Sequence, residues 1–415
     1  MADNLITGID IGTATIRIVV AQLARGANEE QLNIIGVIEV PAQGVSKGSI
    51  ISIEDSVSSI SNALENAERM IGLPIDNAWI GISGTHITSQ ESSGVIAISR
   101  TSGEIQDDDV DRVIEAARSV AAPVNYEVLH VIPKAFTIDN QSGVKDPVGM
   151  SGIRLEVTTQ VIRGLSSHIK NLTKSIYRTG LDINDIILAS LAASESVLSV
   201  RQKELGVALV DIGAATTNII VFEEGDVLHT CVIPIGSDHI TSDIAIGLQT
   251  SIDIAEKVKL EFGSALPKNF EKKDIVNLQD VGGDNQEFSR KYISEIIEAR
   301  AEEMFEKIDI ELQKINRSGL LPAGIVLVGG GAKLSGLVEV GKKKTMLPVS
   351  IGKLQTFTTA VDNVSDVSFA TALGLVLWGY QMNQESGKKM GFSNKFETIK
   401  ASAGRIKNWF KSLIS

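Results

Sequence analysis

Hydrophobic positions along the chain form two patterns that predict different elements. Short runs rich in Val and Ile, such as residues 16–20, 219–222 and 325–328, predict buried strands because small residues flank them. Helical spacing follows Asp107, a candidate N-cap, where apolar residues recur at intervals of three and four. Residues 289–315 predict a long charged helix. The chain therefore combines strands with helices.

One strand–loop–strand pattern occurs twice. The segment that begins at Asp10 reads DIGTAT, and the segment that begins at Asp211, 201 residues later, reads DIGAAT. Seven of eleven positions are identical between residues 10–20 and 211–221. Each copy lies between two apolar, β-branched runs, which is typical of a hairpin. This internal repeat predicts two similar lobes.

The repeated loops have the composition of a phosphate-binding site. Small residues let backbone N–H groups converge on an anion, and threonine hydroxyls add donors. Asp10 and Asp211, each at the end of a predicted strand, are candidate ligands of Mg²⁺ through water. Two such loops facing each other would hold one polyphosphate from both sides. The candidate nucleotide-binding residues here are Asp10, Gly12, Thr13, Thr15, Asp211, Gly213, Ala214, Thr216, Thr217 and Asn218.

Two further motifs are candidates for the rest of such a ligand. Gly329, Gly330 and Gly331 follow a predicted strand, where they allow close backbone approach to a flat ring such as adenine or form only a tight turn. Glu256 and Lys259 lie three residues apart on a predicted helix over residues 252–262. They would either form a surface salt bridge with each other or bind the ribose and the edge of the base of a nucleotide.

These motifs together resemble the actin/Hsp70/sugar-kinase superfamily of ATP-binding proteins. Within it the chain is similar to the FtsA family of bacterial cell-division proteins, on residues 80–87, 129–133, 146–157 and 229–245. The resemblance implies an α/β fold, actin-like and two-lobed, that binds ATP and Mg²⁺. It also implies the following division: subdomain 1A at 1–83 and 164–190, 1C at 84–163, 2A at 191–244 and 318–381 with a return helix, 2B at 245–317, a flexible linker at 382–404 and a membrane-targeting amphipathic helix at 405–415.

The chain departs from the family pattern at the second loop and at the segment that connects the lobes. Ala214 and Ala215 stand where many relatives have glycine, and Asn218 stands where they have aspartate. Ala189 and Ser190 replace a common Glu-Pro pair. An amide or a methyl group cannot act as a general base. We therefore expect ATP binding with at most slow hydrolysis, and we assign no catalytic residue.

Charge and composition narrow the function. The 39 Lys and Arg against 51 Asp and Glu give a net charge of −12, which argues against nucleic-acid binding. One cysteine, Cys231, excludes an intramolecular disulfide and any multi-cysteine metal site, and its apolar neighbours predict a buried structural thiol. The five histidines form no His-x-x-x-His pair, which argues against a zinc hydrolase. The acidic start and the lack of a long apolar run predict a cytosolic chain.

The C-terminal tail has a different charge from the rest of the chain. Residues 386–415 carry +6, whereas the remainder carries −18. At a helical repeat, residues 405–414 have an apolar face with aromatic rings beside a basic face, the pattern of an interfacial membrane helix. Docking on the protein's own core or on a partner groove is the alternative. The candidate membrane-binding residues are Arg405, Ile406, Lys407, Trp409, Phe410, Lys411, Leu413 and Ile414.

The resemblance implies an adaptor at the cytoplasmic face of the inner membrane, at the division site. Such a protein binds ATP, polymerises, and holds the tubulin-like protein FtsZ at the membrane. Its implied partners are the FtsZ C-terminal tail, further copies of itself, anionic lipids and later division proteins. Arg300 matches a family position for the FtsZ tail, or is simply an exposed helical arginine. The alternatives are a PilM-type pilus-assembly ATPase, a small-molecule kinase and, last, a chaperone.

Overall fold

The computed structural model describes residues 5–25, 30–100, 102–120, 123–355, 358–359 and 365–388. The predicted membrane helix at 405–415 and most of the predicted linker lie outside these residues. Where the linker was expected to begin, at residue 382, helix α10 (Ala370–Lys388) instead continues to Lys388. The expected boundary was therefore too early. Among the described helices, none is long and apolar enough to cross a membrane.

The first lobe is built on a six-stranded sheet that begins with the predicted hairpin. β1 and β2 pair antiparallel, and β6 and β11 continue the sheet beyond β1 in parallel. Its strands, in spatial order, are β11 (Asp182–Leu188), β6 (Asn77–Ile82), β1 (Leu5–Ile11), β2 (Thr15–Arg25), β3 (Glu30–Pro41) and β19 (Thr358–Thr359). Its other elements are the hairpin β4 (Val45–Ser46) with β5 (Ser49–Ile50), α1 (Ile53–Ile71) and α3 (Ser166–Tyr177).

The second lobe repeats this arrangement. β12 and β13 form the second predicted hairpin, and β17 pairs with β12 in parallel, as β6 does with β1. Its strands, in order, are β14 (Asp226–Ile233), β13 (Thr217–Glu223), β12 (Val207–Ile212), β17 (Ile325–Val328) and β18 (Val349–Ile351). Its helices are α4 (Ala189–Val197), α5 (Val200–Leu205) and α9 (Leu337–Thr345). The internal repeat therefore corresponds to two lobes of similar construction, as predicted.

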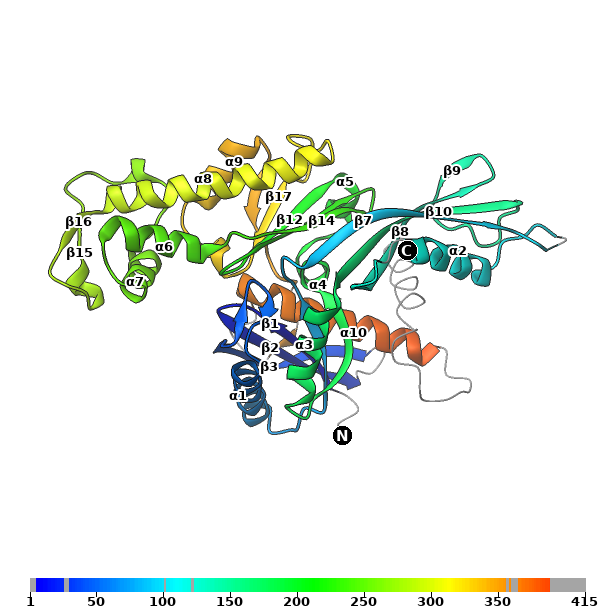
Figure 1. Cartoon of the computed structure of the whole chain (residues 1–415), viewed down its shortest axis with the longest axis horizontal. Coiled ribbons are helices and arrows are strands. Elements are labelled where there is room, and N and C mark those ends of the chain that lie inside the picture. The colour runs from blue at the N-terminus through cyan, green and yellow to red at the C-terminus, as the bar shows by residue number, and fades with distance from the viewer. Residues whose placement is uncertain are drawn as a thin grey trace.

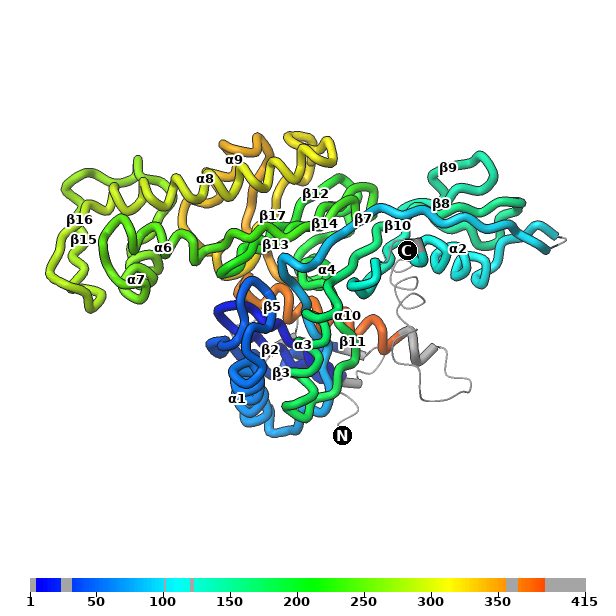
Figure 2. The backbone as a smooth tube through the Cα atoms, in the orientation of Figure 1, coloured from blue at the N-terminus to red at the C-terminus, as the bar shows by residue number. Residues whose placement is uncertain are grey.

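Two insertions extend the lobes in opposite directions, at opposite ends of the long axis (Figures 1 and 2). One is a four-stranded sheet with α2 packed on it and a hydrophobic core of its own. Its elements are β7 (Ile87–Ala97), α2 (Asp107–Val120), β8 (Tyr126–Ile138), β9 (Gln141–Val144) and β10 (Arg154–Leu165). The other is mainly helical: α6 (Ser237–Leu248), α7 (Ile252–Phe262), β15 (Ile275–Asn277), β16 (Glu287–Ser289) and α8 (Arg290–Lys314).

One hydrophobic core extends through both lobes, and a second core lies within the second lobe. Alternate residues of the second-lobe strands face opposite sides, as a pleated sheet requires. Leu209 and Val326 belong to the core that also contains the first lobe, α4 and α10, whereas Val210 and Leu327 belong to the core beneath α8 and α9. α10 contacts α4 on one side and β1, β2 and β6 on the other. This helix therefore joins the two lobes directly next to the loops of the repeat.

Candidate functional site

The two repeated hairpins turn in the same way and open into one cavity. In each loop a glycine N–H donates to the carbonyl oxygen of the threonine three residues later: Gly12 to Thr15 at 3.0 Å and Gly213 to Thr216 at 2.9 Å. Both loops line the same space of about 670 Å³ between the lobes. The small loop residues leave backbone groups accessible to a ligand there.

Almost all of the predicted nucleotide-binding residues line this cavity. They are Asp10, Gly12, Thr13, Thr15, Asp211, Gly213, Ala214, Thr216, Asn218, Glu256, Lys259, Gly329, Gly330 and Gly331. Thr217 is the exception, because its hydroxyl is buried on the other side of β13 and donates to the Ile235 carbonyl at 2.7 Å. Strand alternation explains this difference, since Thr216 and Asn218 face the cavity. The prediction for Thr217 was wrong.

Asp10 and Asp211 are neighbouring carboxyl groups in the cavity wall. Burial, and then the nearby Asp211 carboxylate, raise the pKa of Asp10 to about 7, against the opposing effect of Arg17. Burial also raises the pKa of Asp211, against the hydrogen bond from Asn218 and the charge of Arg17. Two desolvated carboxylates that repel each other favour a divalent cation between or near them. The donor set therefore fits Mg²⁺ with a polyphosphate.

Asn218 connects the two lobes across the cavity. Its side-chain nitrogen donates to Asp211 Oδ2 at 3.3 Å, and its oxygen accepts a hydrogen bond from Ser83 Oγ at 2.6 Å. Ser83 follows β6 of the first lobe, so this contact crosses between lobes. Ala189, where the family pattern that the chain resembles implies a carboxylate, also lines the cavity. At both positions the cavity wall lacks the expected carboxylate, and Asn218 serves as a bridge.

Glu256 and Lys259 form a fixed pair in the cavity wall rather than a loose surface bridge. Lys259 Nζ lies 2.6 Å from Glu256 Oε2 and donates to Thr241 Oγ1 at 2.8 Å. The side chain of Lys259 is only 7 % exposed, whereas that of Glu256 is 38 % exposed. Lys259 Nζ also donates to the Ser237 carbonyl oxygen at 3.4 Å, so three partners set its position before any ligand binds. The pair can present a carboxylate and an ammonium group to a polar ligand edge.

The glycine turn after β17 lies next to the second loop. Val328 at the end of β17 is paired with Asp211 on β12. Gly329 has a φ of +86°, and a Cβ atom placed on it would lie 2.2 Å from Asp211 Oδ1. The turn therefore requires glycine at this position, and it brings backbone directly to the cavity.

Several cavity residues were missed by the sequence analysis. They are Arg17, Glu39, Ser83, Asp238, Lys333 and Ser335. Arg17 Nε donates to Glu39 Oε2 at 2.6 Å, and Lys333 Nζ donates to Asp366 Oδ2 at 2.6 Å. Arg17 occupies the position of Asn218 in the first hairpin, opposite Asp10. The internal repeat therefore contained the signal that identifies Arg17.

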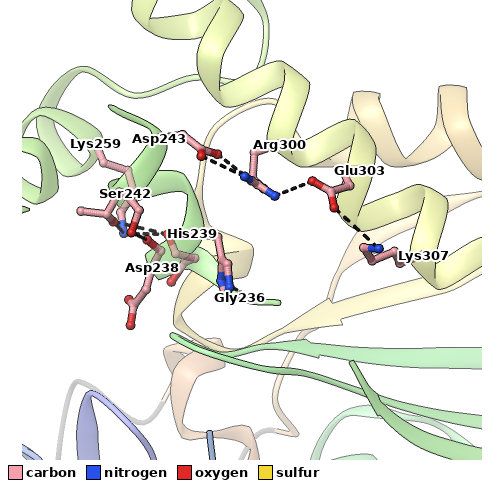
Figure 3. Close-up of polar contacts among 11 residues, drawn as sticks. Gly236, Asp238, His239, Ser242, Asp243, Lys259, Arg300, Glu303 and Lys307 are labelled. Atoms are coloured by element: carbon pink, nitrogen blue, oxygen red, sulfur yellow. Dashed lines mark hydrogen bonds and ion pairs between the residues drawn. The ribbon is translucent and has the colours of Figure 1, made fainter. Parts of the chain in front are cut away.

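Arg300 does not line the cavity and is not a free surface arginine. It is on α8, and its side chain reaches α6, where Nε and Nη2 donate to the two carboxylate oxygens of Asp243 at 2.6 and 2.8 Å (Figure 3). Glu303 Oε2 also accepts a hydrogen bond from Arg300, and Glu303 Oε1 forms an ion pair with Lys307 Nζ at 3.6 Å. The hydrogen bond with Asp243 raises the pKa of Arg300. Its side chain is still 23 % exposed.

Family models match two segments of the chain. The model described as "Cell division protein FtsA" matches residues 208–374, and the model described as "SHS2 domain inserted in FTSA" matches residues 84–163. The cell division protein FtsA of Pseudomonas aeruginosa is 38 % identical over 411 residues, which cover 98 % of this chain and 97 % of that protein.

Solved structures share the fold at low sequence identity. The PilM–PilN type IV pilus biogenesis complex contains a chain with a TM-score of 0.65 and 15 % identity, over 90 % of this chain and 98 % of that one. MreB5 of Spiroplasma citri bound to ADP has a TM-score of 0.53 and 13 % identity, over 94 % of this chain and all of the other. The chain therefore has the actin-like two-lobed fold that the resemblance implied.

Proposed function

Because this chain belongs to the FtsA family of cell division proteins, we propose that it is an ATP-binding adaptor of the division machinery. It would bind ATP between its lobes, assemble with copies of itself, and hold FtsZ at the cytoplasmic face of the membrane at the division site. The observation that supports this most directly is the cavity that both repeated loops line. MreB5 of Spiroplasma citri, which shares the fold, was solved with ADP bound.

The cavity residues suggest how ATP would be held. Backbone N–H groups of the two loops and the hydroxyls of Thr13 and Thr216 would bind the phosphates from opposite lobes. Asp10 and Asp211 would hold the hydration shell of Mg²⁺, which supplies charge neutralisation for the phosphates when it is bound. Glu256 and Lys259 would face the ribose and base edge, next to the glycine turn after β17.

We expect ATP hydrolysis to be slow, below roughly one ATP per second, the low end of the range for ordinary enzymes. Asn218 is an amide engaged with Asp211 and Ser83, and Ala189 has no group that could accept a proton from water. A steady-state phosphate-release assay with purified protein measures the rate. A faster rate would contradict the proposal that the protein binds ATP but hydrolyses it only slowly.

Membrane attachment would come from residues 405–415 and FtsZ attachment from the surface around Arg300. Five apolar side chains, namely Ile406, Trp409, Phe410, Leu413 and Ile414, make one tail a marginal anchor. Self-assembly would therefore strengthen binding by linking many tails. Arg300 presents a planar, bidentate donor on α8, which suits carboxylate groups of a peptide. A peptide carboxylate would compete there with Asp243 and Glu303.

A vesicle assay with FtsZ tests both attachments at once. With ATP and anionic vesicles, the full-length chain should sediment and carry FtsZ with it. In a chain without residues 405–415, the vesicle-bound fraction should fall at least tenfold, because the deletion removes both the apolar face and the basic residues of the tail. The R300A variant should still sediment but carry several-fold less FtsZ.

The matched control is K291A, which removes another cation from α8 and should recruit FtsZ normally. Undiminished sedimentation of the shortened chain would overturn the membrane anchor alone. Equal FtsZ recruitment by R300A and K291A would overturn the Arg300 surface alone.

A further inference from the structure

Three side chains with metal-binding atoms meet where the edge strand of the second-lobe sheet contacts α8. His229 and Cys231 lie two residues apart on β14, so strand geometry directs them to the same face. Glu311, near the end of α8, faces them. The ligand atoms of the three side chains all lie within 4.8 Å of one another. None of the three residues lines the nucleotide cavity.

The distances within this cluster are compatible with those between the ligands of one metal ion. His229 Nε2 lies 3.4 Å from Glu311 Oε2, longer than a charge-assisted hydrogen bond of about 2.8 Å. Two ligand atoms on a tetrahedral zinc ion, at bond lengths near 2.05 Å, are roughly 3.3 Å apart. The other oxygen, Glu311 Oε1, already accepts from Lys314 Nζ at 2.6 Å. The oxygen that faces the imidazole is therefore separate from the one that holds the lysine.

We propose that His229, Cys231 and Glu311 form a binding site for a zinc ion, with water as the fourth ligand. Nitrogen, sulfur and oxygen donors in a tetrahedral arrangement are typical of zinc, whereas Mg²⁺ prefers six oxygen ligands. The side chains of His229 and Glu311 are 19 % and 17 % exposed, so an ion and its water can reach the site. The Mg²⁺ of a bound nucleotide would lie in the other, oxygen-lined site.

Zinc binding at this site would release one proton. The thiol of Cys231 loses its proton to solvent as the zinc–sulfur bond forms, while the imidazole is neutral and the carboxylate is already ionised. The thiolate and the carboxylate then neutralise the charge of Zn²⁺. Lys314, on the second oxygen of Glu311, would hold the carboxylate in place, as outer partners of zinc ligands commonly do.

The position of the site suggests a structural role. β14 is at the edge of its sheet, and it contacts α8 on one side and the strands β7 and β8 of the first-lobe insertion on another. At the start of β14, Asp226 forms an ion pair with Lys145 of that insertion. A zinc ion would fasten α8, which carries Arg300, to the strand that also contacts the other insertion. It would thereby fix the relative position of the two insertions.

Cobalt titration of the full-length protein, with its nucleotide site first saturated with Mg-ATP, tests the site. Cobalt bound to a thiolate gives a near-ultraviolet charge-transfer band, and the chain has a single cysteine, so the band reports only Cys231. We expect the band to saturate at one cobalt per chain and to disappear when zinc is added. C231S should show no band. H229Q and E311Q should each weaken cobalt binding at least tenfold, because the loss of even a residue that only supports a metal ligand lowers metal affinity about 10- to 100-fold.

E306Q is the matched control, since Glu306 is an exposed carboxylate on the same helix and its loss should not change the titration. Zinc should also raise the thermal unfolding midpoint of the unmodified chain and leave that of C231S unchanged. Absence of the band at excess cobalt would overturn the proposal. So would a band with equal affinity in H229Q and E311Q, because the thiol would then bind the metal alone.

Discussion

G329A should weaken ATP binding at least 100-fold, equivalent to about 2.7 kcal/mol. Gly329 has φ +86° and ψ 168°, a backbone region that essentially only glycine occupies. A methyl group there would lie 2.2 Å from Asp211 Oδ1 and 2.6 Å from the Ile212 carbonyl oxygen. The carboxylate would have to leave the position from which it faces the cavity, or the turn would have to move. Isothermal titration with Mg-ATP measures the loss.

The control for G329A is G225A. Gly225 has a similar φ of +82°, but a Cβ atom there meets nothing within 4 Å. G225A therefore also places alanine at a positive φ, but in a hairpin away from the cavity, and should bind ATP normally. Circular dichroism of both variants shows whether the fold is kept. If folded G329A and G225A bind ATP equally well, ATP binding does not depend on the position of the Asp211 carboxylate in the structure.

Local features of the site were predictable because they depend on neighbouring residues. The loops after Asp10 and Asp211, and the glycine turn after residue 328, follow from short sequence patterns whose geometry is confirmed. The direction of Thr217 also depends on local alternation, and the prediction was wrong because it treated every loop threonine as a donor. The pairing of the hairpin would have corrected it, since Asn218 lies opposite Asp211 and shares its face, which directs the neighbouring Thr217 to the other face.

Features that depend on distant parts of the chain were not predictable. The hydrogen bond from Ser83 to Asn218 joins residues 135 apart, on different lobes. Glu311 meets His229 across 82 residues, and a search for two histidines on one helix could not detect such a cluster. The end of α10 was misplaced because its last turns are polar, and polar composition alone does not separate a helix end from a linker.

G374A should lower the free energy of unfolding by about 3 kcal/mol, although helix propensity alone predicts a gain of about 1 kcal/mol from replacing glycine by alanine. At Gly374 the backbone of α10 lies directly against α4. A Cβ atom there would be 1.8 Å from the carbonyl oxygen of Ala192 and 2.3 Å from its carbonyl carbon. These are backbone atoms of a buried helix, so no side chain can move aside.

α10 cannot relieve this clash by shifting away from α4, because the first-lobe sheet holds its opposite side. A Cβ atom on Gly8 of β1 would lie 2.3 Å from the Ala372 carbonyl oxygen, which shows how closely the backbones of β1 and α10 approach. Any displacement also moves Ala370 and Thr371, which line the nucleotide cavity. We therefore expect G374A to weaken ATP binding as well as stability.

Denaturant unfolding of G374A, followed by circular dichroism, measures the effect, and the control is G247A. Gly247 is also inside a helix, but the close contact of a Cβ atom there is with the end of the Ile296 side chain, at 2.5 Å, which can rotate, and the Tyr292 hydroxyl at 3.6 Å is at ordinary contact distance. G247A should therefore be neutral or slightly stabilising, as propensity predicts. If both variants shift the unfolding midpoint upward, α10 and α4 are not in backbone contact. If G374A alone lowers it, the glycine is required because it lets the helix that joins the two lobes pack next to the nucleotide cavity.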